Sequence, residues 1–177
     1  MKKLILPICL VVLGTITAKA QEISGGVELG LPTGTFSDGY GIGFGVTGRY
    51  EKAFGSNTSW LVDLGYVYFS AKSVGGVTGP SMSMIPVQGG IKYYFQEQMK
   101  GFYASGQLGF HHVMVSSFSY GGFDFPSTSE TDFSFAPGIG YHLDKIDIGL
   151  RYQVITTSGT SANLFGIRAA YIFSSGK

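Results

Sequence analysis

Charge is scarce in this 177-residue sequence. Lys, Arg, Asp and Glu together make up 13% of the residues, about half of the roughly 25% that is usual in soluble domains. There is no basic run, and the formal net charge is only +1. The chain therefore lacks the positive charge with which nucleic-acid-binding proteins neutralise phosphates, and we expect no nucleic-acid partner. An apolar content of 44% with so low a net charge also excludes an intrinsically disordered chain.

Long apolar runs are missing as well. The longest, Leu4 to Ile16, is shorter than the about 20 apolar residues that a transmembrane helix needs, which argues against a helical membrane protein. It lies between a basic start, Met1 to Lys3, and the small-residue sequence Ala18 to Ala20. This order is typical of a secretory signal peptide. We predict a signal peptide over residues 1–20, with a buried N-terminal helix as the alternative.

Cysteine is almost absent. Cys9 is the single one in the sequence, and it lies inside the predicted signal peptide. The exported part, residues 21–177, is therefore expected to have no thiol, no disulfide and no cysteine-based metal site. A lipoprotein anchor at Cys9 is not expected, because too little apolar sequence precedes it.

Glycine and aromatic residues are abundant, with 28 Gly and 15% aromatics. From Glu22 onward, apolar residues recur at every second position, which is the period of a β-strand. In residues 146–154, for example, one face reads Ile, Ile, Leu, Tyr, Val and the other reads Asp, Gly, Arg, Gln. No comparable 3.6-residue stripe is present, so no helix is expected. Eight strands in one domain are predicted near residues 22–31, 41–54, 59–71, 83–96, 101–116, 131–143, 146–156 and 163–174.

The connections between these segments alternate in length. Residues 55–57, 97–100 and 144–145 are short connections, whereas residues 32–40, 72–82, 117–130 and 157–162 are longer. In an up-and-down meander, alternate connections lie at opposite ends of the sheet. Short turns at one end and long loops at the other are typical of outer-membrane barrels. The segments also have about the 9–11 residues that a tilted strand needs to cross the hydrocarbon layer.

The composition of the two strand faces indicates which one meets lipid. The polar faces are rich in glycine and poor in the Lys and Glu that a soluble sheet displays. The apolar faces carry aromatic rings near the strand ends, where membrane proteins place them at the headgroup level. We therefore predict an all-β fold, an eight-stranded antiparallel up-and-down transmembrane β-barrel with its apolar face outward. The alternative is a soluble barrel or sandwich. Outward rings expected at the long-loop end are Tyr40, Tyr66, Tyr68, Phe110, Phe133 and Tyr152.

The predicted inner faces carry four acidic and four basic residues. Buried charges are tolerated only when they are paired. Folding the chain about Ser56 places Arg49 opposite Asp63, and folding about residues 144–145 places His142 opposite Asp147. An eight-stranded barrel is just wide enough inside for side chains, so we expect these charges to plug the lumen and exclude a large aqueous pore. The predicted lumen charge network comprises Glu28, Arg49, Glu51, Asp63, Lys92, Asp147, Arg151 and Arg168.

Residues 29–36, residues 39–46 and the sequence Tyr171-Ile172-Phe173 resemble the small bacterial outer-membrane β-barrel family that includes the OmpX-type proteins and the OmpA transmembrane domain. The resemblance covers essentially all of the exported part, as a pattern rather than a sharp motif. It implies the outer membrane of a Gram-negative bacterium, surrounding outer-membrane lipid, and insertion by the barrel-assembly machinery. It does not imply one activity, because barrels of this size include structural proteins, adhesins and lipid-modifying enzymes.

The histidines are the strongest candidates for chemistry. His111 and His112 are neighbours on a strand and point to opposite faces, so they are not expected to share a metal. His111 is followed by His112, Val113 and Met114, and we expect it to lack the nearby serine with which a lipid-deacylating site would be built. His142 is expected to make a structural hydrogen bond near Asp147. We therefore predict no catalytic residue, no cofactor and no metal site.

The loop of residues 117–130 exposes aromatic rings among Ser, Gly and Thr, a mixture typical of adaptable binding surfaces. The alternative is that the rings fold over the barrel mouth. The predicted function is a non-enzymatic outer-membrane barrel serving envelope structure or surface interaction with an unidentified ligand. A lipid-modifying enzyme and a narrow channel are the alternatives. The rings of this possible surface-binding loop are Phe118, Tyr120, Phe123 and Phe125.

Overall fold

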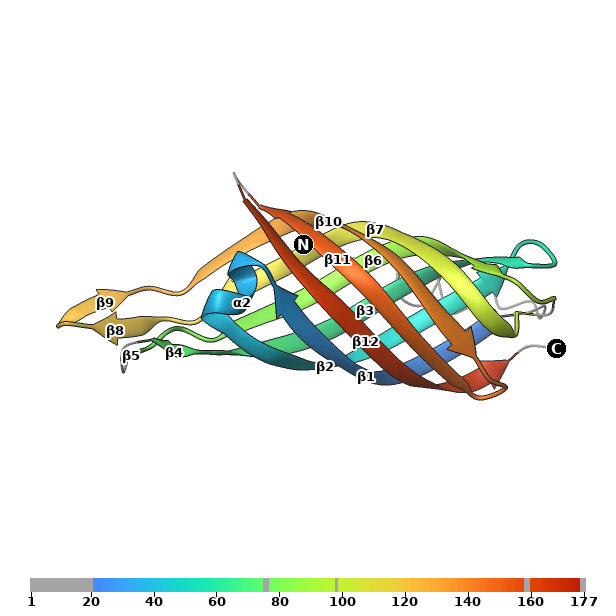
Figure 1. The fold of residues 1–177 in the computed structure, drawn as a ribbon, viewed down its shortest axis with the longest axis horizontal. Coiled ribbons are helices and arrows are strands. Elements are labelled where there is room, and N and C mark those ends of the chain that lie inside the picture. The colour runs from blue at the N-terminus through green and yellow to red at the C-terminus, as the bar shows by residue number, and fades with distance from the viewer. Residues whose placement is uncertain (1–20, 75–76, 98, 158–159, 176–177) are drawn as a thin grey trace, which may run out of the picture.

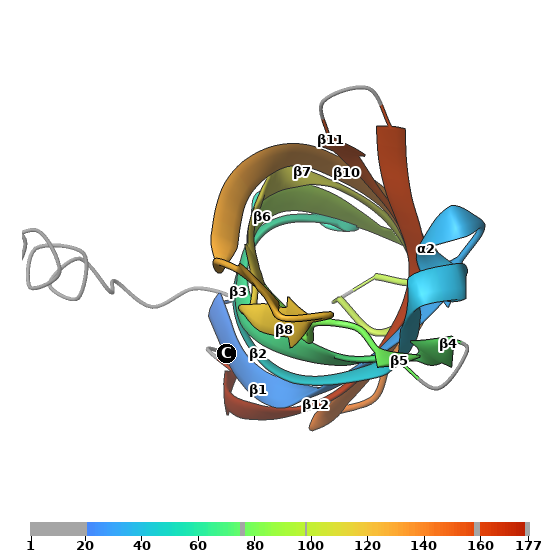
Figure 2. The same cartoon turned by 90° about the vertical axis from the view of Figure 1, so that its left-hand side faces the viewer.

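The computed structural model describes residues 21–74, 77–97, 99–157 and 160–175, and the predicted signal peptide lies outside them. Eight long antiparallel strands close into one barrel, in which the first strand pairs with the last (Figures 1 and 2). The predicted eight-stranded up-and-down barrel is confirmed. Its strands are β1 (Gln21–Thr33), β2 (Tyr40–Ala53), β3 (Thr58–Ala71), β6 (Met82–Tyr94), β7 (Gly101–Val115), β10 (Thr128–His142), β11 (Ile146–Thr157) and β12 (Thr160–Ser175).

The connections lie as their lengths predict. The turns after β2, β6 and β10 lie at one end, and the long loops lie at the other, which we call the outer end (Figure 1). Two of the long loops contain small hairpins that the sequence did not indicate. These are β4 (Ser73–Val74) with β5 (Val77–Thr78), and β8 (Phe118–Tyr120) with β9 (Phe123–Phe125).

The expectation of no helix is wrong at one place. The loop between β1 and β2 contains α2 (Thr35–Gly39), held by hydrogen bonds from the Ser37 amide (3.0 Å) and hydroxyl (2.6 Å) to the Gly34 carbonyl. Its Phe36 is buried. A five-residue helix is too short to produce a periodic apolar stripe, so sequence periodicity could not reveal it. No helix among the described residues is long and apolar enough to cross a membrane.

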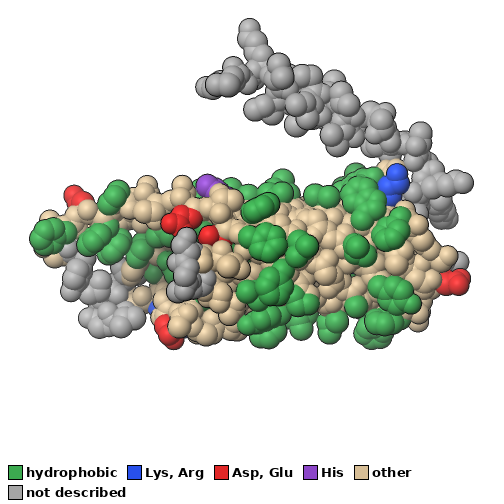
Figure 3. Space-filling view, turned by 90° about the horizontal axis from the view of Figure 1, so that it is seen from above, with side chains coloured by type: hydrophobic (Ala, Val, Ile, Leu, Met, Phe, Trp, Pro, Cys, Tyr) green, Lys and Arg blue, Asp and Glu red, His purple; other side chains and the backbone are tan. Residues whose placement is uncertain are grey.

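The two faces of each strand differ as the alternation predicts. In β2, Ile42, Phe44 and Val46 are exposed on the outside, whereas Thr47 and Arg49 are buried inside. Apolar side chains cover the outer wall on the face seen in Figure 3, and charged side chains lie toward its two ends. This is the surface of a barrel that is solvated by lipid.

The prediction that the Tyr40 side chain points outward at the long-loop end is wrong. The register between β2 and β3 shifts between Tyr40 and Gly43. The Tyr40 ring instead contacts Phe36 of α2, with ring centroids 5.2 Å apart. A strand bulge of this kind changes the face to which a side chain points, and the local sequence does not show it.

The lumen also holds apolar clusters that the sequence analysis did not predict. An outer cluster fills the barrel near its outer end, and a turn-end cluster of Tyr94, Met99 and Tyr103 lies toward the short turns. Phe69 fits because its ring lies against Gly43, where any Cβ would overlap it. The outer cluster consists of Phe36, Val67, Phe69, Met84, Ile155 and Leu164.

Candidate functional site in the barrel lumen and loops

The hairpin of β2 and β3 places Arg49 directly opposite Asp63, as the folding about Ser56 predicts. Two parallel contacts join them, from Arg49 Nε to Asp63 Oδ1 at 2.7 Å and from Nη2 to Oδ2 at 2.8 Å. Both side chains are almost fully buried. Such two-point pairing of guanidinium and carboxylate is both strong and geometrically specific.

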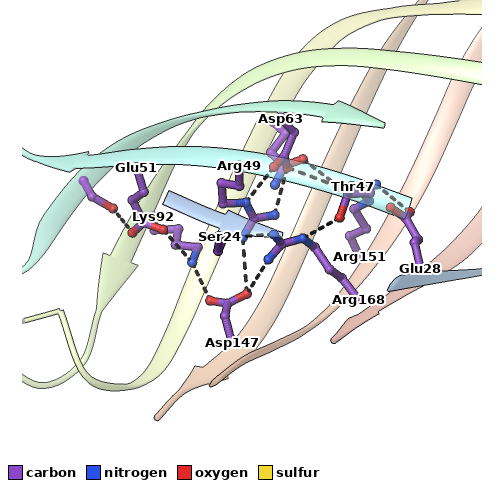
Figure 4. Close-up of polar contacts among 12 residues, drawn as sticks. Ser24, Glu28, Thr47, Arg49, Glu51, Asp63, Lys92, Asp147, Arg151 and Arg168 are labelled. Atoms are coloured by element: carbon purple, nitrogen blue, oxygen red, sulfur yellow. Dashed lines mark hydrogen bonds and ion pairs between the residues drawn. The ribbon is translucent and has the colours of Figure 1, made fainter. Parts of the chain in front are cut away.

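Asp147 on β11 is where three cations of the lumen meet (Figure 4). Its Oδ2 lies 2.7 Å from Lys92 Nζ, and its Oδ1 lies 3.1 Å from Arg168 Nη1 and 3.4 Å from Arg49 Nη1. The Tyr103 hydroxyl donates to the same Oδ1 at 3.2 Å. The carboxylate thus joins strands from opposite sides of the barrel.

Glu51 and Lys92 extend the network toward the short turns. Lys92 Nζ lies 2.8 Å from Glu51 Oε2. The other oxygen of Glu51 accepts hydrogen bonds from the hydroxyls of Ser59 (2.5 Å) and Tyr94 (2.6 Å). Lys92 Nζ also lies 4.1 Å from the centre of the Tyr103 ring, a cation–π geometry.

Arg151 extends the network toward the outer end. Its Nη2 lies 2.5 Å from Glu28 Oε1, across the seam where β1 pairs with β12. Its Nη1 donates hydrogen bonds to Asp63 (3.4 Å) and Gln107 (3.2 Å). All eight charged residues that the sequence assigned to the lumen thus lie in one connected cluster, which we call the lumen network. The polar partners that sequence reasoning missed are also on inward strand positions: Ser24, Thr47, Ser59, Tyr94, Tyr103 and Gln107.

The lumen network leaves little free space. Two cavities of about 10 Å³ each lie beside Arg151, which is at the lower limit for one water molecule. The four anions and four cations of the network balance in charge. Chemically, this arrangement holds strands together and obstructs the lumen.

The two adjacent histidines lie on opposite faces of β7. His111 is buried in the lumen, where its Nδ1 lies 2.9 Å from Ser134 Oγ and its Nε2 contacts Gln153. His112 contacts Thr131 on the outer face (3.0 Å). The described residues contain no group of three or more His, Cys, Asp or Glu side chains arranged to hold a metal ion.

The serine that the sequence analysis did not find near His111 is Ser134, on the neighbouring strand β10. That expectation was wrong because residues 23 positions apart meet only through strand pairing. Ser134 is fully buried and also accepts a hydrogen bond from Gln88 Nε2 (3.1 Å). The second ring nitrogen of His111 faces an amide rather than a carboxylate, so the pair lacks the acid that orients a catalytic histidine.

His142 lies opposite Asp147 in the ladder, as predicted. Its side chain does not bond to Asp147, however. The ring Nδ1 lies 3.3 Å from the Tyr94 hydroxyl, and Nε2 lies 3.7 Å from Glu22. The oxygens of Asp147 instead contact the cations of the lumen network. The contact between His142 and Tyr94 supports a structural role for His142 near the short turns.

The aromatic loop forms the hairpin β8–β9, which projects beyond the barrel wall (Figure 1). The rings of Phe118 and Phe125 stack across it, with centroids 4.7 Å apart and planes 10° apart. Phe123 at the tip is 73% exposed. The side chain of Tyr120 lies outside the described part of the structure.

Comparisons with known proteins agree with this architecture. The sequence profile described as outer membrane protein beta-barrel domain matches residues 6–173. Among solved structures, the chain is similar to Ail, the attachment invasion locus protein of Yersinia pestis, with a TM-score of 0.64 at 17% identity, covering 89% of this chain and 100% of Ail. No curated protein matches the chain significantly.

Two further structures have the same fold. The N-terminal β-barrel domain of Pseudomonas aeruginosa OprF gives a TM-score of 0.58 at 9% identity, covering 89% of this chain and 100% of that domain. Neisserial surface protein A gives a TM-score of 0.52 at 14% identity, covering 88% of this chain and 96% of that protein. At these identities the likeness concerns the fold.

Proposed function

Because the chain belongs to the outer membrane protein β-barrel family, we propose that it is a non-enzymatic outer-membrane barrel whose own side chains close the lumen and whose outer loops serve surface interaction. The observation that carries the closed lumen is the lumen network itself. It joins six of the eight strands with charges that are paired inside the barrel. A buried charge that lost its partner would be strongly disfavoured, so the pairs resist opening of a channel.

The absence of catalysis is supported by the surroundings of His111. Its Ser134 partner is fully buried, and Gln88 and Gln153 occupy the remaining positions around the pair. A lipid acyl group in the outer leaflet cannot reach a hydroxyl that is sealed inside the lumen. The Ser134–His111 contact is best explained as a structural hydrogen bond.

The charge of the outer end bears on the class of surface ligand. One of the Ail structures is a complex with sucrose octasulfate, a heparin analogue. Polyanions require basic side chains, but the described residues at the outer end of this chain include one Lys or Arg, Lys72, against four carboxylates. We therefore propose a ligand other than a sulfated polyanion. The four carboxylates are Asp38, Asp124, Glu130 and Asp132.

We assign the interaction to the hairpin β8–β9. Its exposed Phe123 lies beside the turn, and the stacked Phe118 and Phe125 form the ladder pair farthest from the turn, so apolar rings lie along the whole arm. Exposed aromatic groups of this kind commonly mark interaction sites. Export by a signal peptide over residues 1–20 and insertion by the barrel-assembly machinery complete the proposal, with outer-membrane lipid as the surrounding solvent.

Single-channel recording in planar bilayers tests the closed lumen. The parent protein is expected to give no stepwise conductance, whereas the double variant Arg49→Ala, Asp63→Ala is expected to give measurable steps because it thins the obstruction. Steady conductance of the parent would establish the narrow channel instead. Release of fatty acid from lipid A or phospholipid by the folded parent would establish the lipid-modifying enzyme.

A further inference from the structure

A cavity of about 290 Å³ lies inside the outer mouth of the barrel, above the lumen network. Its walls come from β6, β7, β10, β11 and β12, and Phe36 of α2 closes one side. This volume is close to the lower end of the range for small-molecule sites, and mostly apolar walls are typical of them. The apolar side chains that line it are Phe36, Met82, Met84, Val113, Val115, Ile155 and Ala162.

One buried carboxylate faces this cavity. Asp132 on β10 lines it although the residue is only 9% exposed. Among the described residues, none donates a hydrogen bond to Asp132 or forms an ion pair with it. Its ladder partner His111 directs its ring nitrogens to Ser134 and Gln153 instead. The Asp132 oxygens are not among the fully enclosed side-chain atoms that lack a partner, so they remain accessible from the cavity and a ligand there can bind them.

The surrounding charges specify the sign of that ligand. Glu130, two residues earlier on the same inward face of β10, adds a second carboxylate to the cavity rim. The nearest part of the lumen network offers no free cation, because Arg151 is already held by Glu28, Asp63 and Gln107. A cationic ligand would therefore gain a charge-assisted hydrogen bond, whereas an anion would be repelled.

We propose that the outer mouth binds a small amphipathic cation, a protonated primary amine that carries a short apolar group. The ammonium donates to Asp132 and Glu130, and the apolar group packs against Met82, Met84 and Ile155. This site is separate from the hairpin β8–β9 and does not require that hairpin to bind anything.

Three probes of similar shape and different charge test the proposal: 2-phenylethylammonium, 2-phenylethanol and 3-phenylpropanoate. The folded full chain, labelled with ¹³C at the methionine methyls, is titrated in nanodiscs and observed by NMR. Met82 and Met84 report from the cavity. Met99 in the turn-end cluster and Met114 on the outer face of β7 serve as internal controls. The ammonium is expected to shift Met82 and Met84 saturably and to bind more tightly than the alcohol, with the carboxylate the weakest.

Matched variants separate the carboxylates of the cavity from the general charge of the outer end. Asp132→Asn keeps the shape of the side chain and is expected to weaken ammonium binding at least about tenfold, because the charge-assisted hydrogen bond is lost. Glu130→Gln alters an exposed residue, so folding is unaffected, and it is expected to weaken binding by a smaller factor. Asp124→Asn removes the same charge from the remote hairpin β8–β9 and is expected to change the affinity less than about twofold.

Equal affinity for the ammonium and the alcohol would overturn the proposal, because the site would then be merely apolar. Shifts of Met114 or Met99 as large as those of Met82 and Met84 would show partitioning into the lipid or the barrel wall, and would overturn it as well. So would an unchanged affinity in both Asp132→Asn and Glu130→Gln. None of these outcomes bears on conductance, so a failure here leaves the closed lumen intact, and a conducting parent would leave amine binding intact.

Discussion

Glu28 lies directly opposite Arg168 in the ladder between β1 and β12, yet its carboxylate binds Arg151, one strand further around the barrel. Arg168 instead reaches Asp147, at 3.1 Å, and donates to the hydroxyls of Thr47 and Ser24. Ladder position therefore does not by itself determine which charges pair inside this lumen: it does so for Arg49 and Asp63 but not for Glu28 and Arg168. Long side chains that point into a narrow barrel select partners across it, and the seam is closed by contacts that bridge more than two strands.

The pair of Arg49 and Asp63 is expected to dominate the stability of the lumen network. Asp63→Ala leaves a buried cation without its closest partner, and breaking such a pair costs about 3–5 kcal/mol. Combining it with Arg49→Ala should recover part of the loss. The recovery is incomplete because Arg151 also contacts Asp63. Urea unfolding of the refolded protein in a bilayer measures each corner of the cycle. Strictly additive losses would mean that the two residues do not interact.

The outward position of Leu150 can be tested by comparing arginine substitutions at two depths in the bilayer. Leu150→Arg places a charge against hydrocarbon and is expected to lower the free energy of unfolding by roughly 2–4 kcal/mol if it lies near the bilayer centre. The matched control is Leu143→Arg, an exposed residue beside the short turn after β10. There, near the interface, the same substitution is expected to cost roughly 0–1 kcal/mol. Equal costs at both positions would contradict the assignment of the lipid-facing band.

Gly43 is expected to resist enlargement because of Phe69. A Cβ at Gly43 would overlap the Phe69 ring, so Gly43→Ala should destabilise the barrel by about 1–3 kcal/mol through overpacking. Gly48 on the same strand has no atom within 4 Å of the corresponding position, and Gly48→Ala is expected to change stability by less than about 0.5 kcal/mol.

The substitution Phe69→Leu tests whether overlap with the Phe69 ring causes the destabilisation by Gly43→Ala. If the overlap is responsible, Gly43→Ala combined with Phe69→Leu should be more stable than the sum of the two single effects predicts. Denaturant unfolding of the four proteins measures this coupling. An additive result would assign the strain to the β2 backbone instead of the ring.

The short turns are linked by Lys100 and Asp144, whose Nζ and Oδ1 lie 2.5 Å apart. The hydrogen bond and charge of Lys100 hold the pKa of the Asp144 carboxyl below its ordinary value. A lowered carboxyl pKa stabilises the fold above the unfolded-state pKa, and this contribution is lost as pH falls through the folded-state pKa. Because both groups are exposed, water screens the pair and its effect on overall stability is small.

The measurement is therefore the titration of the Asp144 carboxyl by NMR. In Lys100→Gln its midpoint is expected to rise toward the ordinary carboxyl pKa. The control Lys145→Gln removes an adjacent cation that forms no ion pair with Asp144 among the described contacts, and it should leave the midpoint low. An unchanged midpoint in Lys100→Gln would show that the two side chains do not pair in solution.

The sequence by itself determined the eight strands, the face that each presents to lipid, and the ends at which short turns and long loops lie. All of these follow from local information, because the period of two and the spacing of turn residues do not depend on distant contacts. The opposition of Arg49 and Asp63 belongs to the same class, since a short turn sets the register of its own hairpin.

Only the tertiary structure decided how the lumen is filled. The sequence predicts that Arg151 and Arg168 both lie near Glu28 across the seam, but closure pairs Glu28 with Arg151 and not with its ladder partner Arg168. Closure also brings His111 to Gln153, 42 residues away. In a narrow barrel, an inward side chain can reach partners on several strands. The level of each side chain along the axis depends on strand stagger and on bulges such as the one before Gly43. For that reason the apolar outer cluster, the turn at Phe36 and the buried carboxylate of Asp132 beneath the mouth emerged only once the barrel was closed.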